Sequence, residues 1–540
     1  MGQFPHRERT QPATLGDMSP REVVQYLWLA TAGERGGILS ALVFISACSL
    51  ADTQGEPDLT GNFSKTLPGS VSAMLPRPCA PSGGRDGGPQ RRSGLAASLL
   101  QVDRVVGCGW HAMLQSVPLL HGERLHVVAG SVLESPRGSG RYAVEFVIFV
   151  ESDVTTYESV AQMELEESGV PYSIARTGAS GWFFGASCVW PRTRGGSIKT
   201  DAAISAFARF TLRVRCVVPH GAAASVASDA AGMRWQTSVS FQLEIEEERE
   251  PLHVVLSPHS RQERKPMALC SDPWFKIDVV EERYPGIVAD WLRYHYEVVG
   301  ISEFFLYDTD GSLEPYLSSS GLSHVVRYFS RWPAGFPVLQ ELVDRKWYDA
   351  PDGLAYDHCL YNNMGAFDWI AYLHGLDAWY HSPAHVEGVG AAVSMPVALE
   401  ALRRKAPADL PICGISVRRC NFGARAEQEM DHANGDVEET GKHRNPATRF
   451  NWRLENCTSH GPFEQDDPVL AGDGSAVYCL GHKPVCRAAS RTEVWELTEW
   501  RANHYLDTWK PRCGASCRVR DDGLQQLLAK SAAPPSANNT

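Results

Sequence analysis

The chain lacks the features that mark several common classes of protein. It has no Cys-x-x-Cys pair, so the sequence gives no support for a zinc ribbon or a thioredoxin-like site. It has no excess of positive charge, because 51 Lys and Arg stand against 63 Asp and Glu, for a formal net charge of −12. Nucleic acid is therefore disfavoured as the main partner, since binding phosphates requires clustered basic side chains. We find no internal repeat.

Long apolar runs are also scarce, and the main one lies near the N-terminus. Residues 36–51 read GGILSALVFISACSLA and carry no charge, but the run is shorter than the ~20 residues of a membrane-spanning helix. We interpret it as a signal-anchor or as the apolar part of a cleavable signal, with residues 1–35 as a cytoplasmic or leader segment. The alternative is a buried helix.

Three N-x-[ST] tripeptides, at Asn62, Asn456 and Asn538, agree with a secretory route. We therefore predict a glycoprotein of the Golgi or secretory-pathway lumen, as a single-pass type II membrane protein anchored through its N-terminal segment. A secreted protein is the alternative. Disulfides are expected in that compartment, and the spacing of Cys513 and Cys517 fits a local disulfide.

Composition divides the rest of the chain into four parts. Residues 52–98 are rich in Pro, Gly and Ser and predict a stem, and residues 530–540 predict a disordered tail. Residues 99–255 contain β-branched, partly alternating segments such as RYAVEFVIFVES and FARFTLRVRCVVP, which predict a β-rich, antiparallel, sandwich-like domain. Residues 256–529 form the remaining part.

Helical and strand patterns alternate in residues 256–529. GIVADWLRYHYEVVG has apolar residues at helical spacing and stops at Gly300, and the strand-like ISEFFLYD follows it. LAYDHCLYNNMGAFD then predicts a helix and WIAYLHG a strand. This alternation indicates an α/β fold with a parallel sheet, in which ligands bind at the carboxyl ends of the strands. Asp308, Asp310 and Asp377 fall at such ends.

The order of these segments resembles a known family. The stretches ALCSDPWF, WLRYHYEVVG, EFFLYD, DHCLYN and WIAYLHGLDAW look like the motifs of glycosyltransferase family 92, formerly DUF23. That family includes plant β-1,4-galactan synthases and animal galactosyltransferases that extend the core fucose of N-glycans. The resemblance covers about residues 266–510 and includes Trp291, His295, Tyr307, Asp308 and Cys359.

The resemblance implies a GT-A fold, which is Rossmann-like and binds a nucleotide sugar, preceded by the β-rich domain. It further implies inverting transfer of galactose from UDP-galactose to a glycan or glycoprotein acceptor. Mn²⁺ or Mg²⁺ at a D-x-D motif would neutralise the departing diphosphate. By the same analogy we assign Asp308, Asp310, His295 and Tyr307 to the donor side.

The D-x-D-E motif of the family is degenerate in this chain. Aligned with a one-residue insertion, Gly375 replaces the first Asp, Asp377 is the second, and Ala378 replaces the Glu. Aligned without it, His374 and Leu376 stand in the two Asp positions and Asp377 in the Glu position. Two of the three carboxylates are missing either way. The candidate metal ligands are Asp377 with a histidine, for which His374, His381 and His504 are available.

An inverting displacement also needs a general base near the acceptor hydroxyl. The candidates are Glu464, Asp466 and Asp467 in the acidic segment HGPFEQDDP, for which a solvated loop is the alternative interpretation.

Three hypotheses remain open. The chain is a metal-using galactosyltransferase with a reduced site, a non-catalytic relative that binds a glycan or a nucleotide, or a metal-independent transferase. In the last case basic groups replace the cation, with Arg449, Arg453 and Lys483 as candidates.

Overall fold

The structure is a computed structural model of the chain. It describes residues 104–105, 110–112, 116–118, 124–134, 141–151, 186–192, 195–208, 211–220, 222, 239–245, 251–258, 264–332, 349–383, 393–407, 410–423, 447, 452–454, 467–479, 483–487, 490–495, 499–505, 517–521 and 523–531. The predicted leader, apolar segment and stem lie outside these ranges, as do Cys513 and the three Asn-x-Ser/Thr sites. Within the described ranges, no helix is both long and apolar enough to cross a membrane.

The β-rich region forms two antiparallel sheets. Its strands are β1 (Arg104–Val105), β2 (Trp110–Ala112), β3 (Ser116–Pro118), β4 (Arg124–Glu134), β5 (Tyr142–Glu151), β6 (Ala186–Pro191), β7 (Ser197–Asp201), β8 (Ala203–Ala208), β9 (Thr211–Val217), β10 (Val239–Ile245) and β11 (Leu252–Pro258). One sheet has the order β1-β4-β5-β9-β8, with β3 paired to β4, and the other has the order β2-β11-β10-β6-β7. Because β11 runs to Pro258, this region extends past the predicted boundary at residue 255.

Alternating apolar residues give the two sheets a common core. In β10, Val239, Phe241 and Leu243 are buried, and the residues between them are exposed or half-buried, as expected for a strand with one solvated face. Trp190 of β6 stacks on Phe241 with a ring-centroid distance of 3.7 Å. The disulfide between Cys188 of β6 and Cys216 of β9 joins the two sheets.

The second region alternates helices and strands before it ends in short strands. Its elements are β12 (Lys265–Trp274), α5 (Ile277–Arg283), α6 (Ile287–Tyr294), the π-helix η3 (His295–Val299), β13 (Glu303–Asp308), α7 (Glu314–Ser319), the 3₁₀-helix η4 (Ser323–Val325), β14 (Val326–Ser330), α9 (Asp349–Asn363), β15 (Phe367–Leu373), β16 (Ala378–His381), α11 (Met395–Lys405), β17 (Ile412–Val417), β18 (Arg419–Gly423), β19 (Trp452–Leu454), β20 (Asp467–Ala471), β21 (Ala476–Cys479), β22 (Lys483–Cys486), β23 (Arg491–Trp495), β24 (Arg501–Tyr505), β25 (Cys517–Arg520) and α14 (Gly523–Ser531).

The main sheet of this region has the strand order β14-β13-β12-β15-β20-β17-β23. The neighbours from β14 to β15 are parallel, as predicted, and β17 is parallel to β23. The sheet is nevertheless mixed, because β20 runs antiparallel to both β15 and β17. The direction of a short apolar strand such as β20 cannot be read from its residue pattern, which explains the difference.

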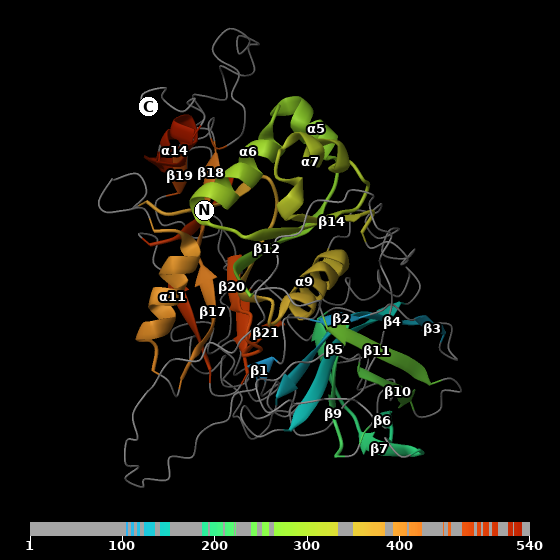
Figure 1. Ribbon diagram of the computed structural model, residues 1–540. Helices are drawn as coiled ribbons and strands as arrows, with labels where there is room; N and C mark the ends of the chain where they lie inside the picture. Colours follow the sequence, from blue (N-terminus) through green and yellow to red (C-terminus); the bar gives the residue numbers. More distant parts are fainter. Residues whose placement is uncertain are drawn as a thin grey trace, which may run out of the picture. The chain divides into compact units, whose positions relative to one another are not determined.

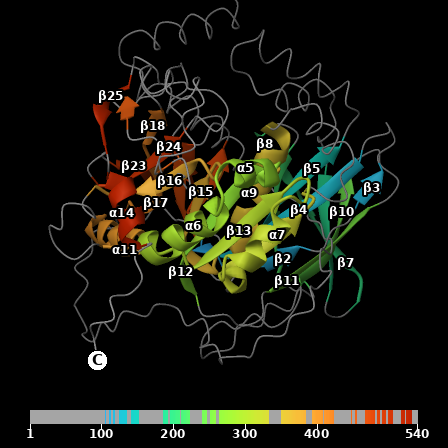
Figure 2. The same ribbon diagram turned by 90° about the horizontal axis from the view of Figure 1, so that it is seen from above.

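Helices cover both faces of the parallel part of the sheet. Figures 1 and 2 show α5, α6 and α7 gathered on one face, and Figure 1 shows α9 on the other. In α6, Ile287, Val288, Trp291 and Leu292 are buried at helical spacing and pack into the core with β12 and β13. A disulfide between Cys270 of β12 and Cys359 fixes α9 to the sheet.

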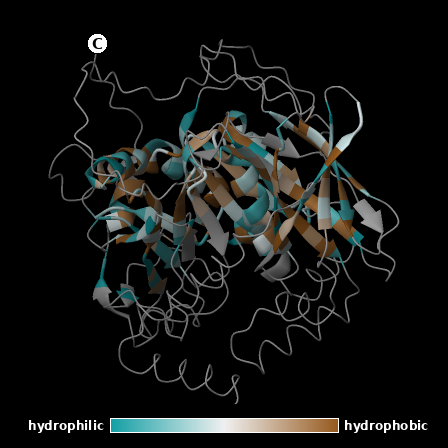
Figure 3. Ribbon diagram, turned by 90° about the horizontal axis from the view of Figure 1, so that it is seen from below, coloured by the Kyte–Doolittle hydropathy of each residue, from teal (hydrophilic) through white to brown (hydrophobic). Residues whose placement is uncertain are grey.

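A second, smaller sheet has the order β16-β24-β18-β19-β25. Its strand β16 follows β15 after a short turn, so the chain passes directly from the main sheet into the small one. Helix α14 contributes the buried Leu524 and Leu528 to the same core and ends at Ser531, just inside the predicted tail. Figure 3 shows that the apolar stretches of the molecule follow its strands, whereas the helices carry hydrophilic stretches.

Candidate functional site

The order of the parallel strands defines where a ligand site is expected. The chain passes from β12 to β13 and β14 on one side, and then returns to the other side of β12 with β15. The point between β12 and β15 is therefore a topological switch, where open α/β sheets bind ligands at the carboxyl ends of the strands. Asp272 lies near the carboxyl end of β12, and His374 directly follows β15.

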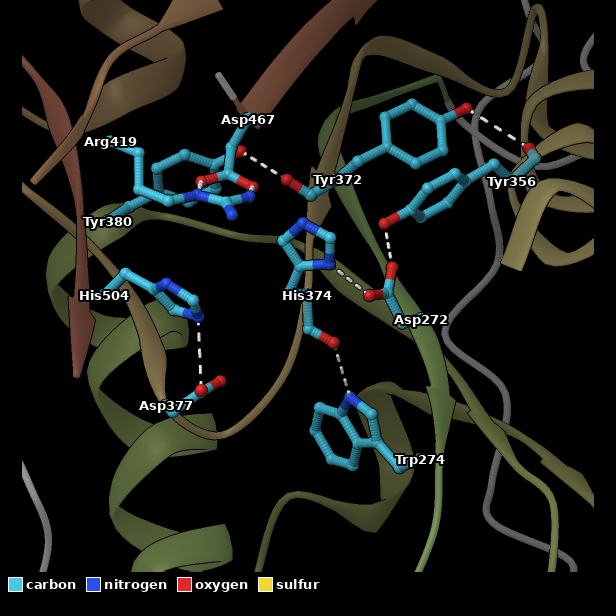
Figure 4. Close-up of polar contacts among 10 residues, drawn as sticks. All are labelled: Asp272, Trp274, Tyr356, Tyr372, His374, Asp377, Tyr380, Arg419, Asp467 and His504. Atoms are coloured by element: carbon cyan, nitrogen blue, oxygen red, sulfur yellow. Dashed lines mark hydrogen bonds and ion pairs between the residues drawn. The ribbon is translucent and has the colours of Figure 1, made fainter. Parts of the chain in front are cut away.

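Asp272 and His374 contact each other at this point (Figure 4). Nδ1 of His374 hydrogen bonds to one carboxylate oxygen of Asp272, and the hydroxyl of Tyr356, from α9, donates to the other. The indole N–H of Trp274 donates to the backbone carbonyl of His374 at 3.1 Å. The imidazole is thus held through its ring and through its own backbone.

The small sheet brings further polar groups to the same place. Ala378 of β16 and Asn421 of β18 are both in register with His504 of β24, so these residues share one face of the sheet. Nε2 of His504 lies 3.1 Å from Oδ2 of Asp377. The backbone N–H of Tyr505 donates to the carbonyl of Asp377 at 2.7 Å, which fixes the turn that carries this carboxylate.

A buried ion pair completes the group. Arg419 of β18 donates to Asp467 of β20 through Nη2 at 2.8 Å and through Nε at 3.2 Å. The ring centroids of His374 and His504 are 6.2 Å apart. We call these residues the switch cluster; its members are Asp272, His374, Asp377, Arg419, Asp467 and His504, and they are drawn in Figure 4.

Burial and mutual charge shift the pKa values in the switch cluster. Burial raises the pKa of Asp272 well above its usual range, although the charge of Arg419 opposes the shift. Burial and the charge of Arg419 lower the pKa of His374 to about 3, so its imidazole is neutral at physiological pH. Burial acts to raise the pKa of Asp377, but His504 more than offsets this and leaves it below its usual value.

These states define what the switch cluster can do. A neutral imidazole can accept a proton, and an ionised carboxylate such as Asp377 can accept hydrogen bonds from sugar hydroxyls. The guanidinium of Arg419 supplies a fixed positive charge next to them. Such a combination is suited to a polar, partly anionic ligand.

The structure brings all three of Asp377, His374 and His504, the predicted metal ligands, into this cluster. Among the described residues, however, no three His, Cys, Asp or Glu side chains are arranged to hold a metal ion. The fourth candidate, His381, pairs in register with Arg501 and lies on the opposite face of the small sheet from His504. Mn²⁺ or Mg²⁺ therefore stays a prediction, and we derive no step through a metal.

The residues assigned to the donor side have structural contacts. Asp308 accepts hydrogen bonds from the backbone N–H groups of Asp310, Gly311 and Leu313, and Asp310 accepts from those of Lys276 and Ser312. Both carboxylates thus hold the turn after β13, as Asp commonly does.

His295 and Tyr307 are fully buried in the core. The hydroxyl of Tyr307 bonds to Nδ1 of His358 at 2.8 Å, and the ring stacks on Phe329. Both side chains thus have structural roles, and their assignment to the donor side stays a prediction. The helical pattern that carries His295 does not reveal which side chains are shielded from solvent.

Of the three candidate general bases, the structure describes one, Asp467. Glu464 and Asp466 lie outside the described residues. Asp467 does not lie in the predicted acidic loop: it begins β20 and is buried against Arg419. The apolar residues that follow Asp467, Pro-Val-Leu-Ala, explain this difference. They pair as a strand with β17, and Asp467 is the first residue of that strand, paired with Val417.

Of the basic candidates for a metal-independent reaction, the structure describes the side chain of Arg453. Arg453 binds Asp521 at 2.9 Å, Arg449 lies outside the described residues, and the side chain of Lys483, in β22, is also outside them.

Three residues of the site were missed by sequence reasoning: Asp272, Tyr356 and Arg419. Asp272 could have been found, since it lies near the end of the strand in ALCSDPWF, and the strand-end rule that selected Asp308 and Asp377 applies to it as well. Tyr356 and Arg419 carry no such signal, because each reaches the site through contacts between segments far apart in the sequence.

Comparison with known protein families finds no matching family for this chain, and a search of curated proteins finds no similar sequence. The resemblance to glycosyltransferase family 92 therefore stays a prediction.

Proposed function

We propose that the chain is a glycosyltransferase that binds a nucleoside-diphosphate sugar at the switch cluster and transfers the sugar to a glycan acceptor. The donor that the family resemblance suggests is UDP-galactose, with inversion at the anomeric carbon. The single observation that carries the proposal is the position of the switch cluster at the carboxyl ends of β12 and β15, where the strand order reverses.

The chemistry of the cluster supports the same reaction class. Transfer from a diphosphate develops negative charge on the leaving group, and the guanidinium of Arg419 places positive charge in the cluster. Asp377, with its side chain 26% exposed and fixed by His504, offers oxygen atoms that can accept hydrogen bonds from sugar hydroxyls. Transfer also requires that the acceptor lose a proton, which the site must take up.

Thermal unfolding with and without UDP tests the binding step. A ligand that binds only the folded state raises its apparent stability, so UDP at 100 times its Kd adds about 2.7 kcal/mol. We expect an increase in Tm with UDP, measured with and without Mn²⁺. If no common nucleotide or nucleotide sugar raises Tm under either condition, the proposal is wrong.

Release of UDP from UDP-galactose in the presence of glycan acceptors tests the transfer step. Asp377→Asn removes one charged hydrogen-bond acceptor, worth about 1.5–3 kcal/mol, so we expect turnover to fall by about ten- to a hundredfold. The matched control is Asp368→Asn at the amino end of β15, the strand that precedes the turn with Asp377; Asp368 pairs with Arg264 at 2.8 Å. This control should retain wild-type turnover. Turnover that persists in excess chelator would identify a metal-independent reaction.

A second candidate function is binding without turnover. It is favoured by the internal pairing of the carboxylates, since Asp377 is bound to His504 and Asp467 to Arg419. Stabilisation by UDP or binding of a glycan, combined with background turnover for all common donors, would support this function in place of the transferase.

A further inference from the structure

Among the described strands, β23 forms one edge of the main sheet, with β17 as its neighbour. The backbone N–H of Arg491 donates to the carbonyl of Pro411 at 3.0 Å, so the backbone groups of Arg491 point toward β17. Successive residues of a strand direct their backbone groups to opposite sides, and those of Thr492 and Val494 therefore point away from β17. No described strand pairs with that outer side of β23.

The side chains of β23 are also open to solvent along most of the strand. Thr492 and Val494 are exposed, and the side chains of Arg491 and Glu493, on the opposite face, are 37% and 32% exposed. An unpaired strand edge is a template for pairing with another chain, and proteins commonly block it with charged side chains such as Lys. β23 instead carries one side chain of each sign, two residues apart.

These two charges match those of a second copy of the chain in one antiparallel register. When the two-fold axis lies at Thr492, the two copies of Thr492 face each other and exchange both backbone hydrogen bonds, which their outward-pointing groups allow. Arg491 of one protomer then lies opposite Glu493 of its partner, and the symmetry forms the reverse pair as well. Both pairs occupy non-hydrogen-bonded positions, where the side chains on neighbouring strands are closest.

The opposite edge strand of the sheet, β14, does not have this property. Its one charged side chain, Arg327, donates to Glu303 of β13 at 2.5 Å, so β14 offers no pair of opposite charges to a second copy. In β23, Arg491 and Glu493 lie 2.5 Å apart within the strand. Because both stay partly exposed, each can also bond to its counterpart across a two-fold axis.

We propose that β23 is a self-association edge, through which two copies of this chain join their main sheets in antiparallel fashion, with two ion pairs between Arg491 and Glu493. Such an interface is isologous and closed, so association stops at the dimer. The proposal is independent of the transferase function, because no member of the switch cluster lies in β23.

Sedimentation velocity of the full chain over a range of concentrations tests the proposal, and we expect a monomer–dimer equilibrium for the wild type. Arg491→Glu and Glu493→Arg each place like charges opposite each other at two positions. Each should therefore raise the Kd of self-association by about tenfold or more. The double variant, Arg491→Glu with Glu493→Arg, restores both ion pairs and should return the Kd to within about threefold of the wild type.

A mixture of the two single variants tests the register directly. In a mixed dimer, the Arg491→Glu chain presents two negative side chains to the two positive side chains of the Glu493→Arg chain. The mixture should therefore dimerise at concentrations at which each variant alone is monomeric. The matched control is Arg404→Glu in α11, where Arg404 is 76% exposed and pairs with Glu400 at 3.1 Å. It makes the same change of charge and should leave the Kd unchanged.

Three outcomes would overturn the proposal. The first is a wild type that stays monomeric at every concentration, and the second is a dimer whose Kd neither single variant changes. The third is a pair of monomeric variants that do not associate when mixed, because the copies would then join in another register. A wild-type Tm for each variant shows that a loss of association is not a loss of fold.

Discussion

The imidazole of His295 lies wholly inside the aromatic core between α6 and β16. Its Nδ1 bonds to the carbonyl of Trp291 at 2.8 Å, and its Nε2 accepts a hydrogen bond from the backbone N–H of Tyr380 at 3.3 Å. The ring of Trp291 lies 4.3 Å from it, centroid to centroid. Both nitrogens are satisfied only by the neutral ring, so burial lowers the pKa of His295 to about 3.

This shift makes stability depend on pH in a defined direction. The pKa of an unfolded histidine is about 6.5, so between that pH and about pH 3 the unfolded state binds one more proton than the folded state. The contribution of the neutral His295 to the free energy of unfolding is therefore fully present above pH 6.5. Below that pH it falls by about 1.4 kcal/mol per pH unit. The free energy of unfolding, measured by chemical denaturation from pH 4.5 to 7.5, should depend less steeply on pH for His295→Gln than for the wild type.

The control for this prediction is His324→Gln, because His324 lies exposed in η4. It should leave the pH dependence as in the wild type. Equal slopes for the wild type and His295→Gln would contradict a buried, neutral His295.

The positions of residues at strand ends and in motifs predicted part of the site. They could not predict which of these side chains are buried. The strand-end rule led to Asp377, and the family motif to His374 and His504, which lie together in the structure. The same reasoning assigned Asp308 and His295 to the donor side, which stays a prediction; in the structure the side chain of Asp308 holds a turn and that of His295 lies in the core. Which side of a helix or turn faces a ligand depends on neighbours that are distant in sequence.

At the scale of elements, the helix that leads to β13 was predicted in part from the spacing of its apolar residues. Helical spacing from Ile287 and a stop at Gly300 were predicted, and both are confirmed. The last turn is a π-helix, His295–Val299, which the spacing did not predict because a single widened turn leaves the apolar positions nearly unchanged. Gly300 has φ +92° and lies against the start of α11.

Gly300 and Gly286 form a matched pair for testing this contact. Both have positive φ, so alanine costs about 1–2 kcal/mol at either position from backbone strain alone. A Cβ at Gly300 would also lie 2.9 Å from Cβ of Ser394, whereas a Cβ at Gly286 would meet nothing within 4 Å. Overpacking adds about 1–3 kcal/mol, so urea denaturation should show a larger loss for Gly300→Ala than for Gly286→Ala.

Equal losses for the two alanine variants would mean that η3 does not press against α11 in solution. A double variant, Gly300→Ala with Ser394→Gly, removes the clashing Cβ and should recover the overpacking part of the loss. The part that comes from positive φ should remain.

On the scale of the whole molecule, one buried ionic group links the β-rich sheets to the α/β region. Glu145 of β5 is fully buried, and Arg487, which follows β22, donates to both of its oxygens. Tyr361 of α9 donates to Glu145 at 2.9 Å, and Arg213 of β9 lies 3.9 Å from it. Glu145 and Arg487 are 342 residues apart, so no local pattern could have predicted their contact.

Glu145 should therefore contribute strongly to the stability of the whole described unit. Glu145→Gln keeps the shape of the side chain but leaves the charges of Arg487 and Arg213 buried without their partner, a change that costs about 3–5 kcal/mol. The matched control is Glu244→Gln in β10, because Glu244 forms an exposed ion pair with Lys199 at 2.8 Å. Exposed pairs contribute about 0–1 kcal/mol, so urea denaturation should separate the two variants clearly.

The carboxylate of Glu145 also makes the stability depend on pH in the acid range. Burial acts to raise the pKa of Glu145, but Arg487 and Arg213 more than offset this and hold it far below its usual value. Its contribution is thus present above the unfolded pKa of about 4.3 and is lost as the pH falls below it.

In hydrogen exchange at pH 4 to 7, strands β5 and β13 should open together in the wild type, because Glu145 joins the two regions. In Glu145→Gln, β5 should open at lower free energy than β13, and unchanged protection of β5 would contradict the link.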